Sequence, residues 1–329
     1  MTGYSLQPPT QPNHFELLDL KIDSILGDIR NFDDLNIAVK KCKAEIVFHL
    51  AAQPLVRQSY KNPTETFATN LMGTVNLFEA CRQAQSVKAI VIVTSDKCYE
   101  NRERDWGYRE DDPMGGHDPY SASKGCAELI IASYRRSFFA IDAYLKTHQT
   151  LVASVRAGNI IGGGDWGQDR LVPDIMRAAS KSKKVLIRNP QAARPWQHVM
   201  EPLAGYMLLG QHLYEGKKEF SEAWNFGPDE RGYRNVIAVV KDLQGYWPTI
   251  DFKVASAEKG PHEANLLKLD CSKALAKLSW RPVWTGSAMF EKTAQWYREF
   301  YESGRVLSQE QLTEYVNDAK KEQMSWAKQ

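Results

Sequence analysis

The feature that most constrains the fold is a set of short, continuous apolar runs that end in polar residues. The run 88–95 (Lys-Ala-Ile-Val-Ile-Val-Thr-Ser) is rich in β-branched residues and shows no polar alternation. Such a run predicts a strand buried on both faces, as in parallel sheets. The ranges 46–52 and 151–156 have the same character, and helical spacing lies between the runs. The alternation predicts an α/β fold with a Rossmann-like, doubly wound parallel sheet.

A change of pattern near residue 160 predicts a second domain. The chain of 329 residues is long enough for one large or two ordinary domains. Beyond the last strand run the sequence becomes irregular, with a Gly-Gly-Gly-Asp-Trp stretch at 162–166 and many Trp and Pro residues. We therefore expect a Rossmann-like domain over 1–158, to which the chain returns around 196–228. Residues 159–329 are expected to form mainly a smaller C-terminal α/β domain that holds a substrate.

Composition excludes several classes of partner. The net charge of +2 gives no support for a nucleic-acid partner. No apolar stretch has the length of a membrane span, and no signal peptide precedes the first polar segment. The five cysteines are scattered without CxxC spacing, which is typical of reduced thiols in a cytoplasmic protein and not of a metal site.

Tyr120 and Lys124 are the first candidates for chemistry. At positions i and i+4 they lie on one face if the segment is helical. An ammonium beside a phenol favours the phenolate, and lowering a tyrosine pKa by about three units takes about 4 kcal/mol. For the spacing on its own, a solvated pair on a surface helix is the commoner explanation. Ser95 and Asp96 favour chemistry, because they end a strand where open α/β sheets bind ligands.

These motifs together resemble the extended short-chain dehydrogenase/reductase family. The matching stretches are Gly27–Arg30, His49–Ala52, Asn70, Thr94–Asp96 and the Tyr120/Lys124 pair. More narrowly, the chain resembles the CDP-glucose 4,6-dehydratases of the nucleotide-sugar branch through the stretches 94–101, 156–166 and 194–199. Dehydratases acting on dTDP-glucose usually carry Asp-Glu where this chain has Asp96-Lys97, which favours the CDP branch.

The resemblance implies NAD as cofactor and a set of residues that would bind it. Asp28 and Ile29 would hold the adenine, and small residues after the second apolar run would let the cofactor approach. Asn70 would tie that loop to the neighbouring helix. The full implied cofactor set is Asp28, Ile29, Leu50, Ala51, Ala52, Asn70, Thr94, Tyr120 and Lys124.

The resemblance also implies a substrate, CDP-glucose, and residues that would hold it. Asn159, Arg194 and His198 would contact the nucleotide sugar. Arg suits a diphosphate because its guanidinium donates to two oxygens at once. His198 is expected to pack or to hydrogen-bond locally and not to catalyse.

The implied reaction is an internal redox cycle that serves deoxysugar biosynthesis, for example for lipopolysaccharide. Tyr120 would take the proton of the glucose 4-hydroxyl while hydride leaves C4 for NAD, with Lys124 lowering the Tyr120 pKa and Ser95 binding the hydroxyl. Asp96 would protonate the departing 6-hydroxyl. Lys97 would be, or would assist, the base at C5. Hydride would return to C6, giving CDP-4-keto-6-deoxy-D-glucose.

The GxxGxxG loop that opens such domains is absent, because residue 1 falls in what would be the second strand. We therefore expect a shortened chain whose first strand and helix are missing.

Two alternatives to a dehydratase remain: a nucleotide-sugar epimerase or decarboxylase of the same family, or a non-catalytic remnant that binds nucleotide sugar. The ranges 62–83 and 119–139 are expected to pair copies of the chain into a homodimer or higher homo-oligomer.

Overall fold

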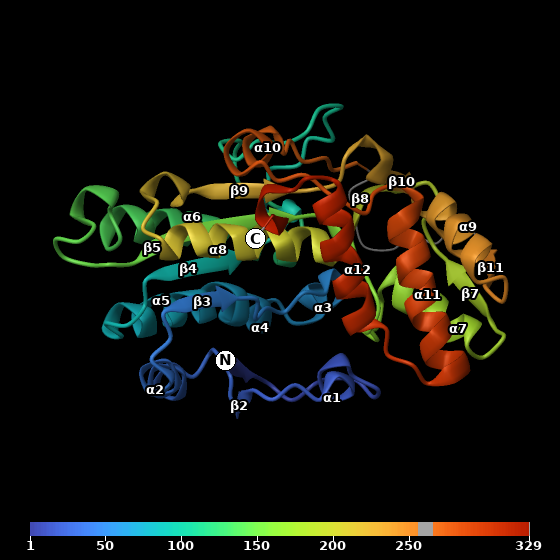
Figure 1. Ribbon diagram of the computed structural model, residues 1–329, viewed down its shortest axis with the longest axis horizontal. Helices are drawn as coiled ribbons and strands as arrows, with labels where there is room; N and C mark the ends of the chain where they lie inside the picture. Colours follow the sequence, from blue (N-terminus) through green and yellow to red (C-terminus); the bar gives the residue numbers. More distant parts are fainter. Residues whose placement is uncertain (256–265, 329) are drawn as a thin grey trace.

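A four-stranded parallel sheet forms the centre of the computed structural model, which describes residues 1–255 and 266–328. The strand order is β3-β4-β5-β9, and Figure 1 shows the strands stacked in this order. Their bounds are Ile46–His49 (β3), Ala89–Val93 (β4), Leu151–Ala157 (β5) and Ala223–Phe226 (β9). The prediction of parallel strands at the runs 46–52, 88–95 and 151–156 is confirmed, and β9 adds a fourth parallel strand.

Both faces of this sheet are covered by helices, because alternate residues of a strand point to opposite sides. Ile90, Ile92 and Val152 face one apolar cluster, whereas Ala89 and Val91 face another. The first face is covered by α2 (Phe32–Cys42), α5 (Gly73–Gln83) and α6 (Pro119–Ser137). The second is covered by α8 (Met200–Tyr214) and α10 (Ser272–Leu278). Chain segments from beyond residue 159 therefore complete the large sheet.

The first two strands form a separate parallel pair beside the four-stranded sheet. β1 (Thr2–Ser5) pairs with β2 (Asp23–Leu26), with α1 (His14–Leu18) between them in sequence. Within residues 1–255 and 266–328, no strand bonds this pair to β3. The pair is attached by packing instead, since Tyr4 and Ile29 join the cluster of α2 and α5.

The range 62–83 is helical and contains a π-helical turn. Asn62 caps its start by accepting from the Glu65 amide at 3.1 Å, and Pro63 follows. The helix runs as α4 (Pro63–Phe67), a π turn (Ala68–Met72) and α5, preceded by α3 (Val56–Lys61). Asn70 lies in the π turn and is buried. Such single turns often occur at functional sites.

The smaller sheets lie at the other end of the molecule (Figure 1). One is three-stranded, in the order β10-β8-β6, and the other pairs β7 with β11. The bounds are β6 (Asn159–Ile161), β7 (Lys184–Ile187), β8 (Ala193–His198), β10 (Tyr233–Asn235) and β11 (Asp251–Val254). The helices here are α7 (Leu171–Ala179), α9 (Val236–Tyr246), α11 (Ser287–Ser303) and α12 (Ser308–Lys321). Trp166, Trp196 and Trp296 contribute to the apolar cluster between them.

Among the helices described, none is both long and apolar enough to cross a membrane. All five cysteines are free thiols.

Candidate active site

Helix α6 brings Tyr120 and Lys124 to the carboxyl end of the large sheet. Asp118 caps this helix by accepting from the Ser121 amide at 3.0 Å, and Pro119 occupies its first turn. Tyr120 and Lys124 are both buried. The ammonium of Lys124 donates to the Val93 carbonyl of β4 at 3.3 Å. The predicted i, i+4 pair therefore lies against the sheet and not on a solvated surface.

Ser95 and Asp96 lie just beyond β4, where the chain makes a 3-10 turn (Asp96–Cys98). The Ser95 hydroxyl donates to Oδ1 of Asp96 at 3.0 Å and accepts from the Lys97 amide at 3.2 Å. It also hydrogen-bonds the Tyr120 hydroxyl. The strand end and the helix thus converge on one cluster of reactive groups.

A hollow of about 410 Å³ opens over this cluster. Asp96, Lys97, Asn159 and Arg194 all contribute to its lining. The ammonium of Lys97 lies 5.9 Å from the centre of the Tyr120 ring. Asn159 reaches the hollow from β6 and Arg194 from β8, strands that pair with each other. Asp96 and Lys97, proposed for catalysis, therefore share one hollow with Asn159 and Arg194, proposed for substrate binding. Ser95, Tyr120 and Lys124 do not line this hollow.

The electrostatics of the pair differ from the sequence-based expectation. Burial raises the pKa of Tyr120 to about 12, an effect opposed by the Ser95 hydrogen bond and reinforced by Asp96. Burial lowers the pKa of Lys124 to about 8. The lowering of the Tyr120 pKa expected from Lys124 is not seen in this site, where desolvation of the phenolate is the largest effect.

Asp96 is suited to hold a proton. It is 3% exposed, and burial raises the pKa of its carboxyl despite the opposing effects of Lys97, Ser95 and Arg194. A raised pKa keeps a carboxyl protonated closer to neutral pH, which is the property that a general acid needs.

Asn70 links the loop after β3 to helix α6. Its side chain accepts from the Gln53 amide at 2.8 Å and donates to the Gln53 carbonyl at 3.1 Å and to the Ser123 hydroxyl at 2.8 Å. The link to Gln53 is the tie that the sequence predicted, and the bond to Ser123 was not foreseen. This loop begins with Leu50, which is 55% exposed, and continues with the small residues Ala51 and Ala52.

These features fit a dinucleotide. Small residues at the carboxyl end of a parallel strand leave room for close approach of a cofactor, and the buried amide of Asn70 fixes the shape of that loop. Leu50, Ala51, Ala52 and Asn70 therefore remain our candidates to hold NAD, together with Tyr120 and Lys124.

Three other predicted cofactor residues already use their side chains. The Asp28 carboxylate accepts from the Arg30 amide and guanidinium, with the shortest contact at 2.5 Å. Ile29 packs in the apolar cluster of α5. The Thr94 hydroxyl donates to Glu128 at 2.5 Å. The side chains of Ile29 and Thr94 are therefore engaged within the protein, whereas Asp28 would share its carboxylate with Arg30.

His198 lies outside the site, which corrects its assignment to the substrate. The imidazole is 1% exposed, packs against Trp284 with ring centres 4.9 Å apart, and does not line the hollow. Its Nδ1 accepts from the Met200 amide at 3.3 Å. The local packing expected for His198 is what the structure shows, because the imidazole is buried against Trp284 and does not reach the hollow that Arg194 lines.

The sequence reasoning missed a buried polar network under the site, formed by Glu128, Arg156 and Tyr99. Glu128 lies four residues after Lys124, so the i, i+4 spacing could have placed it on the same helix face. It also missed Arg170, whose positive charge acts on the Tyr120 phenol.

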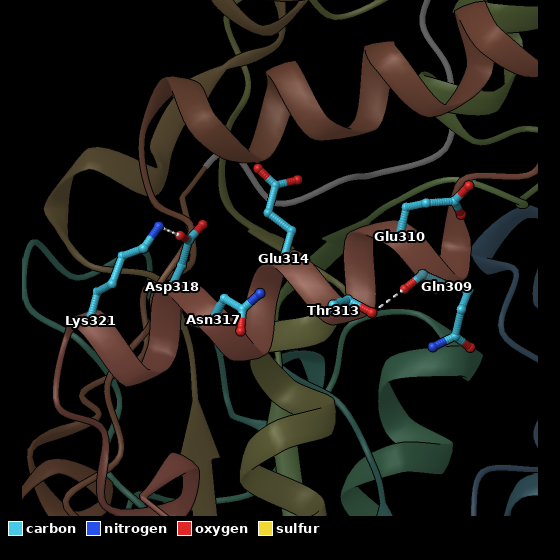
Figure 2. A pocket seen from close by; sticks show the side chains of 7 residues that line it. All are labelled: Gln309, Glu310, Thr313, Glu314, Asn317, Asp318 and Lys321. Atoms are coloured by element: carbon cyan, nitrogen blue, oxygen red, sulfur yellow. Dashed lines mark hydrogen bonds and ion pairs between the residues drawn. The ribbon is translucent and has the colours of Figure 1, made fainter.

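A second hollow of about 440 Å³ carries no such chemistry. Figure 2 shows that its lining side chains all rise from α12, with Lys321 paired to Asp318. It is the outer surface of one helix.

Comparisons with known proteins agree with this geometry. Residues 10–293 match a family model described as GDP-mannose 4,6 dehydratase. The CDP-glucose 4,6-dehydratase of Salmonella typhimurium (strain LT2) is 48% identical over 319 residues, spanning 96% of this chain and 89% of that protein.

Two solved structures show the same fold. UDP-glucuronic acid 4-epimerase from Bacillus cereus, in complex with UDP-glucuronic acid and NAD, matches with a TM-score of 0.75 at 20% identity over 91% of each chain. DesIV, a dTDP-glucose 4,6-dehydratase from Streptomyces venezuelae with NAD and TYD bound, matches with a TM-score of 0.71 at 22% identity, covering 86% of this chain and 81% of that chain.

Fold and site together define an extended short-chain dehydrogenase/reductase of the epimerase and dehydratase type. Within that class, the chain belongs to the family described as GDP-mannose 4,6 dehydratase.

Proposed function

We propose that this protein is an NAD-dependent lyase that converts CDP-glucose to CDP-4-keto-6-deoxy-D-glucose and water. The observation that carries the proposal is the convergence of Asp96 and Lys97 with Asn159 and Arg194 in one hollow beside Tyr120. An acid and a neighbouring base are needed to remove water across C5 and C6. The 48% identity to a CDP-glucose 4,6-dehydratase supports the same reaction and the same nucleotide.

Each side chain has a defined task. Ser95, bonded to Tyr120, orients the substrate 4-hydroxyl and shares its proton with the phenol. Lys124, held by the Val93 carbonyl, contributes positive charge close to the reacting groups. Arg194 and Asn159 bind the nucleotide sugar from the small sheet. NAD⁺, when bound, supplies a hydride acceptor and a positive charge.

Asp96 and Lys97 distinguish dehydration from epimerisation. Asp96 donates its proton to the departing 6-hydroxyl, and its buried position favours the protonated form before that step. Lys97 lies on the same turn and acts at the C5 proton. An epimerase acting through Tyr120 and Lys124 has no need for an acid at C6.

The two ranges proposed to pair copies of the chain present exposed apolar side chains. Met72 is 51% exposed in the π turn, and Leu129 is 60% exposed on α6. Sedimentation velocity tests this part, since Leu129→Glu should convert a dimer to a monomer, and an unchanged sedimentation coefficient would place the interface elsewhere.

The direct test is to incubate the purified protein with CDP-glucose and NAD and to measure the product mass. Loss of one water with the CDP group retained supports a dehydratase. A product of unchanged mass but altered sugar configuration supports an epimerase. Binding of CDP-glucose with no product in the presence of saturating NAD supports a binding protein and contradicts the proposal.

A further inference from the structure

A buried ion pair lies under the candidate active site and has no part in the roles proposed above. Nη2 of Arg156 is 2.8 Å from Oε2 of Glu128, and the two side chains are 4% and 3% exposed. Burying two charges costs desolvation energy, so such a pair adds little net stability relative to apolar residues of similar size. The role of the Glu128–Arg156 pair is therefore better judged from the elements that it connects.

The Glu128 carboxylate connects helix α6 to the end of β4 and to the middle of β5. Its Oε1 accepts from the Thr94 hydroxyl at 2.5 Å, and its Oε2 accepts from the Ser154 hydroxyl of β5 at 2.8 Å. Thr94 directly precedes Ser95, and Glu128 lies one helical turn after Lys124. Each half of the candidate site is therefore one residue or one turn away from this carboxylate.

Arg156 holds the far end of the segment 94–99. Its Nη1 donates to the Tyr99 hydroxyl at 2.6 Å and to the Glu110 carbonyl at 3.0 Å. The Tyr99 hydroxyl in turn donates to Oδ1 of Asn225 at 2.7 Å on β9. Glu128 therefore binds this segment at Thr94 and Arg156 binds it at Tyr99. Ser95, Asp96 and Lys97 lie between these two contacts.

Glu128 also acts on Lys124 through charge. Its carboxylate favours the protonated lysine and so opposes the lowering of the Lys124 pKa by burial. In a dry interior such an interaction is weakly screened.

We infer that Glu128 and Arg156 are positioning residues whose ion pair fixes helix α6, with Tyr120 and Lys124, against the segment that carries Ser95 and Asp96. The expected effect on kcat rests on the proposed function. The expected effect on the Lys124 titration is independent of that function, because Glu128 and Lys124 interact in the protein without turnover.

The test is Glu128→Gln, which keeps the size of the side chain and removes its charge. With CDP-glucose and NAD we expect kcat to fall about 10–100-fold while KM stays within about threefold, because interactions made only in the transition state are lost. In protein labelled with carbon-13 at the lysine ε position, the Lys124 signal, assigned by its loss in Lys124→Arg, should titrate at lower pH than in the wild type.

Glu79→Gln is the matched control. Glu79 also contacts α6, accepting from the Tyr134 hydroxyl at 2.9 Å, and it also pairs with an arginine, Arg82, at 2.7 Å. It lies outside the network, so kcat and the Lys124 titration should be unchanged.

The double variant Glu128→Gln with Arg156→Gln separates positioning from stability. It removes the orphaned guanidinium, so the thermal midpoint should recover toward the wild type, while kcat should remain at least about tenfold low. If kcat of the double variant recovered together with its thermal midpoint, the Glu128–Arg156 pair would have a structural role only. Wild-type kcat in a folded Glu128→Gln protein, or an unmoved Lys124 titration, would overturn the inference.

Two further outcomes are covered. If Glu128→Gln does not fold, Tyr99→Phe removes the Arg156 bond at the other end and should lower kcat by about tenfold with little change in KM. Wild-type kcat in Tyr99→Phe would overturn the inference. If the wild type has no dehydratase activity, the proposed function fails, and the Lys124 titration still decides whether the pair sets the charge of the site.

Discussion

Replacing Asp96 by Asn should separate the two halves of the proposed reaction. Asn has nearly the same shape and retains an oxygen that can accept from the Ser95 hydroxyl, which lies 3.0 Å from Asp96. It has no acidic proton for the departing 6-hydroxyl. Loss of a general acid lowers a rate by about 10²–10⁴-fold, equivalent to about 3–5 kcal/mol of activation free energy. Oxidation at C4 depends on Ser95 and Tyr120 and should stay within about threefold.

The assay is a single turnover with enzyme in excess over CDP-glucose. Reduced cofactor, followed by its absorbance, reports C4 oxidation, and product mass after rapid quenching reports loss of water. Asp96→Asn should accumulate reduced cofactor before slow dehydration. Asp251→Asn is the control, since Asp251 lies on the exposed strand β11, outside the hollow's lining, and pairs with Lys184 of β7. Equal slowing of oxidation and dehydration in Asp96→Asn would refute its role as the acid.

Three further predictions concern folding and cofactor binding. Asn70→Ala leaves the Gln53 amide without its hydrogen bond and should cost about 1–3 kcal/mol of unfolding free energy. It should also weaken NAD binding, and an unchanged Kd for NAD by calorimetry would contradict the cofactor role. His49 is buried and its pKa is lowered to about 3, below the unfolded value near 6.5, so its contribution is complete above pH ~6.5 and is lost as pH falls toward 3. At pH 5 about 2 kcal/mol of this contribution to the unfolding free energy has been lost. The unfolding free energy measured in urea should therefore differ less between pH 7.5 and pH 5 for His49→Gln than for the wild type. Glu201 is 0% exposed and accepts from two backbone amides and from the Tyr315 hydroxyl of α12. Glu201→Ala should therefore cost about 3–5 kcal/mol of unfolding free energy and speed proteolysis of α12. An equal digestion rate in the variant and the wild type would show that this carboxylate does not anchor the helix.

Local sequence was sufficient for the large parallel sheet and for the helix start at Asn62 and Pro63. The apolar runs need burial on both faces whatever their neighbours, and Asn followed by Pro marks a helix start. The Asn70 tie was also accessible, because a polar residue inside an apolar helix requires a partner.

What sequence reasoning could not give depends on distances across the fold. The i, i+4 spacing places Lys124 near Tyr120 but carries no information on burial, which raises the phenol pKa to about 12. The Glu128–Arg156 pair joins residues 28 positions apart on different elements.

The most direct measurement of the central claim is the fate of the C4 hydrogen of the substrate. CDP-glucose carrying deuterium at C4 should be converted to a 4-keto-6-deoxy product with the deuterium in the C6 methyl group, because the hydride removed at C4 is returned at C6 within the same site. Deuterium retained at C4 in a product that has kept its water, or deuterium lost from the sugar altogether, would contradict the account.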